Sequence, residues 1–307
     1  MLREGLLFLS RSGTARKVVM NAPFARSAAR RFVAGETLDD AIDAARRINA
    51  DRMAVTLDYL GESVRDRAEA TAAADTYLRM IDRLVAEGID GNVSLKLTQM
   101  GQDIDEELLR SNVGRVLRRA AEHDMFVRFD MESSDYTQRT LDFVQRVWEE
   151  GHTNCGIVLQ SMLRRTEADT RWANERGIRV RLCKGAYMEP EELAFQEKAE
   201  VDASYVRCTH LLLDDGTYPA IATHDPAMLD ATKQHARDHG IRPDSFEFQM
   251  LYGVRRDLQR RLVADGWRVR VYVGFGNAWY PYFMRRLAER PANVLFIANS
   301  LVKEWID

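Results

Sequence analysis

The chain has 307 residues, of which 46% are hydrophobic and 30% are charged, a composition typical of a globular enzyme. Its formal net charge of -3 provides no basic excess for binding a nucleic acid. No run of 18 apolar residues occurs, so we expect no membrane-spanning helix. The three cysteines, Cys155, Cys183 and Cys208, fit neither a disulfide framework nor a set of zinc ligands. We therefore expect a reducing compartment and no metal.

The first 33 residues are basic, with a single acid, Glu4, and seven cations: Arg3, Arg11, Arg16, Lys17, Arg26, Arg30 and Arg31. An arginine-rich, acid-poor segment is typical of an organelle transit peptide, and also of a basic amphipathic arm that packs on its domain. An amphipathic helix follows, with Thr37 as its capping residue. We divide the chain into an N-terminal helical arm, residues 1–50, and a barrel domain, residues 51–307.

Eight short apolar segments alternate with longer helical patterns along the rest of the chain. Their enrichment in Val, Ile, Leu and Phe is typical of buried parallel strands. The segments are MAVTL (53–57), NVSLKL (92–97), MFVRFD (125–130), CGIVLQ (155–160), IRVRLC (178–183), PAIATH (219–224), SFEFQ (245–249) and VRVYV (269–273).

The intervening segments are long enough for crossover helices. Apolar residues recur at helical spacing in 104–120 and 141–148, and Asp225-Pro226 is a typical helix start. Five glycines stand where a helix must end before the next strand: Gly88, Gly151, Gly177, Gly240 and Gly266. The pattern predicts an α/β fold, a (βα)8 TIM-type barrel with an N-terminal helical arm, and an open doubly wound sheet is the main alternative.

In such a barrel the active site forms at the carboxyl ends of the strands. Polar residues at those ends include several cations and a single aspartate: Lys96, Asp130, Gln160, Arg181, Lys184, Thr223, His224, Gln249 and Tyr272. Buried cations need a partner, so this set predicts an anionic ligand, either a carboxylate or a phosphate.

The segment 279–291, WYPYFMRRLAERP, predicts a partly buried helix that carries Arg285 and Arg286. Buried guanidinium groups favour a planar anion such as a carboxylate. The preceding GFGNAW (274–279) is a poor match to a dinucleotide fingerprint, and we interpret it as a flexible loop. These residues predict a barrel enzyme for a small anionic substrate and leave its cofactor open. A Schiff-base lyase or aldolase using Lys96 or Lys184, and a non-catalytic binding barrel, are the alternatives.

From about residue 20 to the end, the chain resembles the short, monofunctional bacterial form of the proline dehydrogenase family. The matching motifs are SLKLTQMG (94–101), RFDME (128–132), VLQSMLRRTEAD (158–169), VRLCKGAY (180–187), ATHD (222–225), FEFQMLYGV (246–254) and YFMRRLAERPAN (282–293). The resemblance implies a barrel that binds FAD non-covalently and oxidises L-proline to Δ1-pyrroline-5-carboxylate, the first step of proline degradation to glutamate. It also implies hydride transfer from the proline δ-carbon to FAD and electron transfer onward to a membrane quinone.

The resemblance assigns roles to residues of this chain. It implies catalytic or buttressing roles for Asp130 and Tyr187, and substrate binding by Lys96, Tyr272, Leu251, Arg285 and Arg286. It implies that FAD contacts Met131, Gln160, Arg181, Lys184, Gly185, Ala186, Thr223, His224 and Glu289. One departure is Gly274, which replaces a proline common in the family and which we expect to loosen the loop after the last strand.

Quinone use implies a cytoplasmic protein with a peripheral contact on the inner face of the cell membrane. The basic segment 3–31 is a candidate for that contact, and a packed helix is the alternative. The sequence leaves open whether the chain forms a homo-oligomer.

Overall fold

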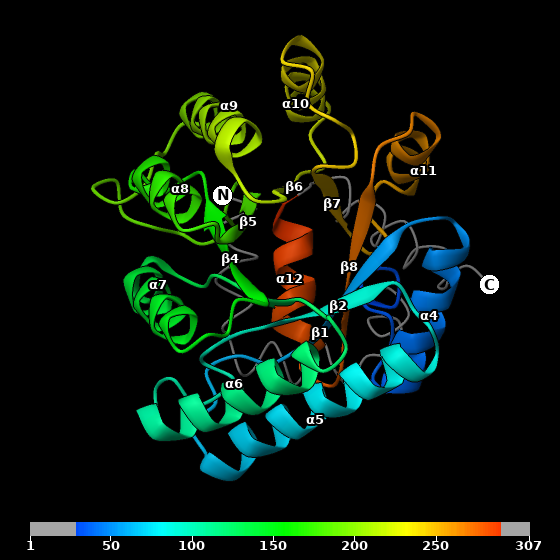
Figure 1. Ribbon diagram of the computed structural model, residues 1–307, viewed down its shortest axis with the longest axis vertical. Helices are drawn as coiled ribbons and strands as arrows, with labels where there is room; N and C mark the ends of the chain where they lie inside the picture. Colours follow the sequence, from blue (N-terminus) through cyan, green and yellow to red (C-terminus); the bar gives the residue numbers. More distant parts are fainter. Residues whose placement is uncertain (1–28, 290–307) are drawn as a thin grey trace, which may run out of the picture.

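The computed structural model describes residues 29–289, except the side chains of Arg286, Ala288 and Glu289. Eight parallel strands close into a barrel in chain order, as predicted (Figure 1). The strands are β1 Ala54–Tyr59, β2 Gly91–Leu95, β3 Val127–Phe129, β4 Cys155–Gln160, β5 Arg179–Cys183, β6 Ala220–Ala222, β7 Glu247–Leu251 and β8 Val269–Phe275. Within residues 29–289, no helix is long and apolar enough to cross a membrane.

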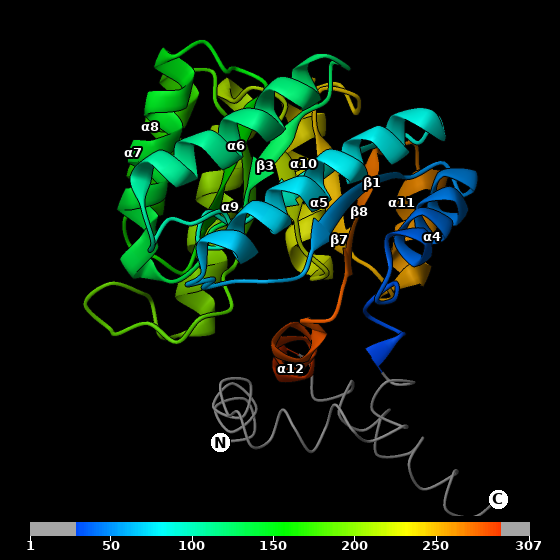
Figure 2. The ribbon, with the colours of Figure 1, turned by 90° about the horizontal axis from the view of Figure 1, so that it is seen from below.

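Helices surround the barrel and cover one of its ends. They are α4 Leu38–Ala50, α5 Arg67–Ala86, α6 Glu106–Ala121, α7 Ser134–Glu149, α8 Thr166–Glu175, α9 Lys198–Asp215, α10 Pro226–Asp238, α11 Arg256–Ala264 and α12 Trp279–Glu289. The last helix, α12, does not join the ring but lies across the carboxyl ends of the strands (Figures 1 and 2). The ring position beside β8 and β1, where the helix after the last strand would normally pack, is occupied by α4.

The helix starts and ends follow local sequence signals. Thr37 caps α4 through a reciprocal capping box with Asp40, and Asp225 caps α10, which has proline at its first position. The five predicted helix-ending glycines all have positive φ. The buried face of α4 belongs to the main core, together with Val55 and Leu57 of β1. Residues 1–28 of the predicted arm lie outside the described residues, so the division at residue 50 stays a prediction.

The barrel interior is polar, whereas its outer face is apolar. Alternate strand residues point to opposite faces. Hydrogen bonds across the barrel, such as Arg181 to Gln249 and Tyr272 to Asp130, identify the inward-facing set. The outward-facing set is buried under the helices and includes Val93, Leu95, Val127, Phe129, Ile157, Leu159, Val180, Leu182, Val271 and Val273. Most barrels of this type fill their interior with branched apolar side chains. The interior of this barrel therefore contains charged side chains, where most others contain aliphatic ones.

Several predicted strand ends differ from the observed ones, and the ends of β1 and β8 change the interpretation of the site. β1 continues past residue 57 to Tyr59, which places Asp58 inside the barrel. β8 continues through Phe275, so Gly274 is a strand residue paired with Asp58 and not part of a loop. The prediction that Gly274 loosens a loop is therefore wrong. Its missing side chain instead makes room for Leu60, because a Cβ there would lie 2.9 Å from Leu60 Cδ2.

Candidate active site

Asp130 organises the polar side chains at the carboxyl end of the barrel. One of its oxygens accepts hydrogen bonds from Ser94 Oγ at 2.5 Å and from Arg181 Nη1 at 2.7 Å. Its other oxygen accepts a bond from Tyr272 Oη at 2.7 Å and lies 3.6 Å from Lys96 Nζ. Burial would raise the pKa of Asp130, but Arg181 and Lys96 outweigh it, so the carboxylate stays ionised with a lowered pKa.

Asp58 is a second buried carboxylate in this cluster. It is fully buried, lies 3.2 Å from Lys96 Nζ and accepts a hydrogen bond from Tyr77 Oη. Burial would lower the pKa of Lys96, but Asp58 and Asp130 outweigh burial and hold this pKa above its ordinary value. The prediction of a single aspartate among the cations was therefore wrong. We call Asp58, Lys96, Asp130, Arg181 and Tyr272 the carboxyl-end cluster.

Arg285 of α12 faces this cluster from above. Its guanidinium forms two hydrogen bonds with the Glu62 carboxylate, at 2.9 and 3.2 Å. Burial would lower the pKa of Arg285, but Glu62 outweighs burial, so the group stays charged. Glu62 lies in the loop after β1 and had not been predicted as a site residue. Arg286 and Glu289 also belong to α12, and their side chains lie outside the described residues.

The less polar wall of the space beneath α12 is formed by three side chains: Tyr187, Leu251 and Tyr272. All three are half-buried, and Leu251 and Tyr272 pack against the apolar cluster that includes Tyr280 and Phe283 of α12. Burial raises the pKa of Tyr187, and the charges of Arg285, Glu62, Glu132 and Lys96 also act on its hydroxyl. The predicted substrate residues whose side chains are described thus converge on one place, beneath α12.

Glu132 is an acid that the sequence reading missed. It is 6% exposed, and both of its oxygens lie within hydrogen-bonding distance of Thr98 Oγ1, at 2.8 and 2.9 Å. Burial raises its pKa to about 7, which Lys96 opposes in part. The only signal in the sequence was the acid two residues after Asp130, on the same side of the extended chain.

Apart from Glu289 of α12, the predicted cofactor residues lie at the ends of β3, β4, β5 and β6 and in the segments that follow them, which we call the rim. Met131 and Gln160 are buried, and the Gln160 amide donates to the Glu132 carbonyl at 2.8 Å. Lys184 forms ion pairs with Asp202 and Asp225, neither of which was predicted as a site residue. A phosphate at Lys184 would therefore share this cation with two carboxylates.

The geometry of this rim is compatible with FAD. Gly185 has φ +102 and no room for a side chain, because a Cβ would meet Met162 Sδ at 2.4 Å. The missing side chain makes room for Met162 beside the loop backbone, and the next residue, Ala186, is half-buried. His224 Nε2 accepts a hydrogen bond from the Leu251 backbone at 2.9 Å, which leaves Nδ1 as the donor of a neutral imidazole. Thr223 is buried beside it, with its hydroxyl accepting from the Asp225 backbone at 3.1 Å.

A second set of charges lies deeper in the barrel, near the amino ends of the strands. Arg270 Nε donates to Glu247 at 2.8 Å and its Nη1 to the Val55 carbonyl at 2.8 Å. Arg128 donates to the Ile157 and Arg179 carbonyls, at 3.1 and 2.8 Å. We call Arg128, Glu247 and Arg270 the amino-end cluster. Gln249 joins the two clusters by donating to Glu247 and accepting from Arg181, at 2.5 Å each.

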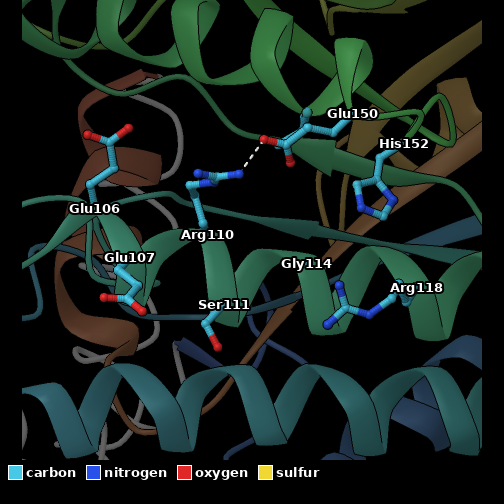
Figure 3. Close-up of a pocket in the computed structure, with 9 residues that line it drawn as sticks. Glu106, Glu107, Arg110, Ser111, Gly114, Arg118, Glu150 and His152 are labelled. Atoms are coloured by element: carbon cyan, nitrogen blue, oxygen red, sulfur yellow. Dashed lines mark hydrogen bonds and ion pairs between the residues drawn. The ribbon is translucent and has the colours of Figure 1, made fainter.

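An open groove on the outside of the barrel contains none of the predicted site residues. It runs along α6 and is lined by Glu106, Arg110, Arg118, Glu150 and His152, among others. Figure 3 shows Arg110 reaching Glu150 across it. Its charges are mixed and lie at the surface, so we place the active site beneath α12 instead.

A family model described as proline dehydrogenase matches residues 41–299. The chain belongs to the proline dehydrogenase family. It is 40% identical over 302 residues to proline dehydrogenase 2 of Bacillus subtilis (strain 168), covering 98% of this chain and 99% of the relative. It is 42% identical over 279 residues to proline dehydrogenase of Deinococcus radiodurans, covering 90% of each.

The chain is also similar to a solved structure, proline utilization A from Bdellovibrio bacteriovorus inactivated by N-propargylglycine. The TM-score is 0.80 at 28% identity, over 89% of this chain and 33% of that longer chain. Membership of the family confirms the predicted enzyme class: oxidation of proline to Δ1-pyrroline-5-carboxylate, with FAD as the cofactor. The roles of individual residues stay predictions.

Proposed function

We propose that the space beneath α12 binds L-proline with its carboxylate against Arg285, Arg286 and Lys96. One observation carries the proposal: Arg285 and Lys96, which are 189 residues apart in the sequence, both lie near enough to Tyr187 for their charges to lower the pKa of its hydroxyl. A carboxylate held by two charged groups in a desolvated pocket is bound strongly and in one orientation. The pyrrolidine ring then lies against Tyr187, Leu251 and Tyr272.

FAD, when bound along the rim of β3 to β6, supplies the acceptor for a hydride from the proline δ-carbon. The chain contributes the placement of that carbon, through the carboxylate contacts and the wall of the pocket. Asp130 keeps Tyr272 and Arg181 in place through its two hydrogen bonds of 2.7 Å. The proline amine must be neutral for hydride to leave the adjacent carbon.

The electrostatics also disfavour the Schiff-base alternative. A lysine nucleophile must lose its proton, and enzymes achieve this by lowering its pKa. Asp58 and Asp130 raise the pKa of Lys96 instead. Lys184 is held between the carboxylates of Asp202 and Asp225. Lys96 therefore acts as a fixed cation and not as a nucleophile, and Lys184 is engaged by two carboxylates.

Three further parts of the proposal come from the resemblance: a quinone acceptor, a peripheral contact with the inner face of the cell membrane, and cytoplasmic location. We place the membrane contact on the basic segment 3–31, which lies almost wholly outside the described residues. Deleting residues 1–20 should weaken liposome binding and quinone turnover while activity with a soluble dye is retained. An equal loss in both assays would make the segment structural.

The test of the central proposal uses the flavin-loaded enzyme. Anaerobic proline should bleach its visible flavin absorbance, and no bleaching would overturn the proposal. Arg285→Met or Arg286→Met should lower kcat/KM for proline roughly 30-fold or more, since losing one partner of a desolvated charge pair costs about 2–5 kcal/mol. Turnover of prolinamide, which lacks the carboxylate charge, should fall much less. Equal losses for both compounds would remove the arginines from carboxylate recognition.

A further inference from the structure

The loop between β5 and α9, residues 184–197, carries Tyr187. Its two ends are tied to the segment after β4. The Lys184 carbonyl accepts from the Met162 backbone at 2.9 Å, and the Leu193 carbonyl accepts from the Arg164 backbone at 2.9 Å. Between these ties the loop has two further anchors: the Glu191 carbonyl accepts from Arg164 Nε at 2.9 Å, and Glu189 binds the start of α7.

The start of α7 needs a partner that its own sequence does not supply. The first backbone N–H groups of a helix have no partner within the helix. Four helices, α4, α5, α6 and α10, are capped by a side-chain oxygen of their own N-cap residue: Thr37, Asp66, Asp105 and Asp225, respectively. Ser133, the N-cap residue of α7, forms no such bond. Glu189 supplies the missing acceptor from 55 residues away. Its carboxylate accepts the Ser134 backbone N–H at 2.8 Å and also the Ser134 hydroxyl.

The residues that flank Tyr187 in the loop have few contacts of their own. Met188, between Tyr187 and Glu189, is 59% exposed, so its side chain packs against little. On the other side of Tyr187, Gly185 has the positive φ of a permissive backbone position. Tyr187 itself packs against the small apolar cluster of Met162, Leu163 and Ala194. Two residues of extended chain span only about 7 Å, so a shift at Glu189 is transmitted to Tyr187.

We propose that Glu189 is a positioning residue for proline oxidation, because its contact with the start of α7 holds Tyr187 over the substrate pocket. The inference rests on the proposed function and on the place of Tyr187 in it. The helix dipole adds to the anchor, since a carboxylate at a helix start is stabilised by the partial positive charge there. Glu189 acts through Tyr187 and does not itself touch proline.

The first test measures kinetics of the flavin-loaded Glu189→Ala enzyme. KM for proline should rise about tenfold, while kcat and flavin content change less than threefold. The reason is that a misplaced pocket wall weakens the binding of the substrate and of the transition state equally. Glu189→Gln keeps one acceptor oxygen and should restore most of the affinity. Glu192→Ala, at an exposed position of the same loop, is the matched control and should leave KM unchanged. A normal KM in Glu189→Ala would overturn the proposal.

A second test separates positioning of the loop from stability of α7. Asp is a preferred N-cap residue, so Ser133→Asp should restore the Tm lost in Glu189→Ala. The double variant should still have the raised KM, because the loop stays detached. If KM recovers together with Tm, Glu189 acts through helix stability and the inference is wrong.

A double-mutant cycle tests the route through Tyr187. In a Tyr187→Ala background, Glu189→Ala should produce no further rise in KM, because the side chain that it positions is gone. A full tenfold rise in that background would overturn the inference. Failure of the proposed function looks different, since the wild-type flavin would then not be bleached by proline at all.

Discussion

The two charge clusters inside the barrel are built differently. In the amino-end cluster, Arg270 donates to Glu247 and to a backbone carbonyl, and Arg128 donates to two backbone carbonyls of the strands themselves. In the carboxyl-end cluster the partners are side chains, and Lys96 and Asp130 each stand one residue beyond a strand end. Backbone partners are fixed by the fold, whereas side-chain partners can exchange with a ligand. The comparison predicts that damage to the amino-end cluster costs stability and damage to the carboxyl-end cluster costs activity.

The largest effect should come from Glu247→Gln. The change leaves Arg270 buried with no charged partner, and breaking a buried ion pair in this way costs about 3–5 kcal/mol. Denaturant unfolding of the flavin-free protein should report that loss, while KM for proline changes less than threefold. Replacing both partners, Glu247→Met with Arg270→Met, should recover most of the stability. A large rise in KM with unchanged stability would abolish the distinction between the clusters.

Asp130→Asn should affect mainly catalysis. It removes the charge that Arg181, Lys96 and Tyr272 share, while keeping the size of the side chain. Losing a desolvated charge partner costs about 2–5 kcal/mol, so kcat/KM for proline should fall roughly 30-fold or more. Steady-state kinetics of the flavin-loaded variant measure this. Kinetics close to those of the wild type would show that the carboxyl-end cluster, like the other, is only structural.

Glu132→Gln should change the pH dependence of stability. The pKa of Glu132 is about 7 in the folded protein, above the ordinary 4.5. Below pH 4.5 the group is protonated in both states. Between pH 4.5 and 7 it ionises only in the unfolded chain, so the free energy of unfolding falls as pH rises, by roughly 3 kcal/mol in total.

The variant lacks this titration, so its unfolding free energy should fall less between pH 5 and 8 than that of the wild type. Urea unfolding at both pH values, with Glu192→Gln as the exposed control, measures the difference. Equal pH dependence in wild type and Glu132→Gln would show that Glu132 is ionised at pH 5 in the folded protein.

The sequence predicted the barrel because its signals are local. Apolar runs, the Asp225-Pro226 pair and the helix-ending glycines each depend on a few adjacent residues. The rule that the active site forms at the carboxyl ends of the strands then predicted that four side chains lie close together, and they do: Lys96, Asp130, Arg181 and Tyr272. Glu62, the acidic partner of Arg285, was not predicted because an ion pair can join distant positions. The two residues are 223 positions apart in the sequence.

Asp58 could have been found from the alternation of strand residues. Thr56 and Asp58 in β1 repeat the inward polar pattern of Asn92 and Ser94 in β2. A charged residue usually marks the end of a buried strand, so the apolar run alone predicts that β1 ends at residue 57. In a barrel with a polar interior, a charge can continue the strand. The position of α12 over the barrel end had no local signal, since a helix after the last strand normally joins the ring.

The smallest effect should come from Gly274→Ala. By strand alternation Gly274 faces the same way as Arg270 and Tyr272, so it is the place in β8 where the carboxyl end of the interior lacks a side chain. An added Cβ would lie 2.9 Å from Cδ2 of buried Leu60 and must displace it. Overpacking of this kind costs about 1 kcal/mol when a flexible side chain can adjust, so Tm should fall by a few degrees while kcat/KM stays within twofold. In a Leu60→Ala background, which removes Cγ and both δ-carbons, Gly274→Ala should cost nothing further. A cost that persists there would mean that the strain lies in the β8 backbone and not in the space beside Leu60.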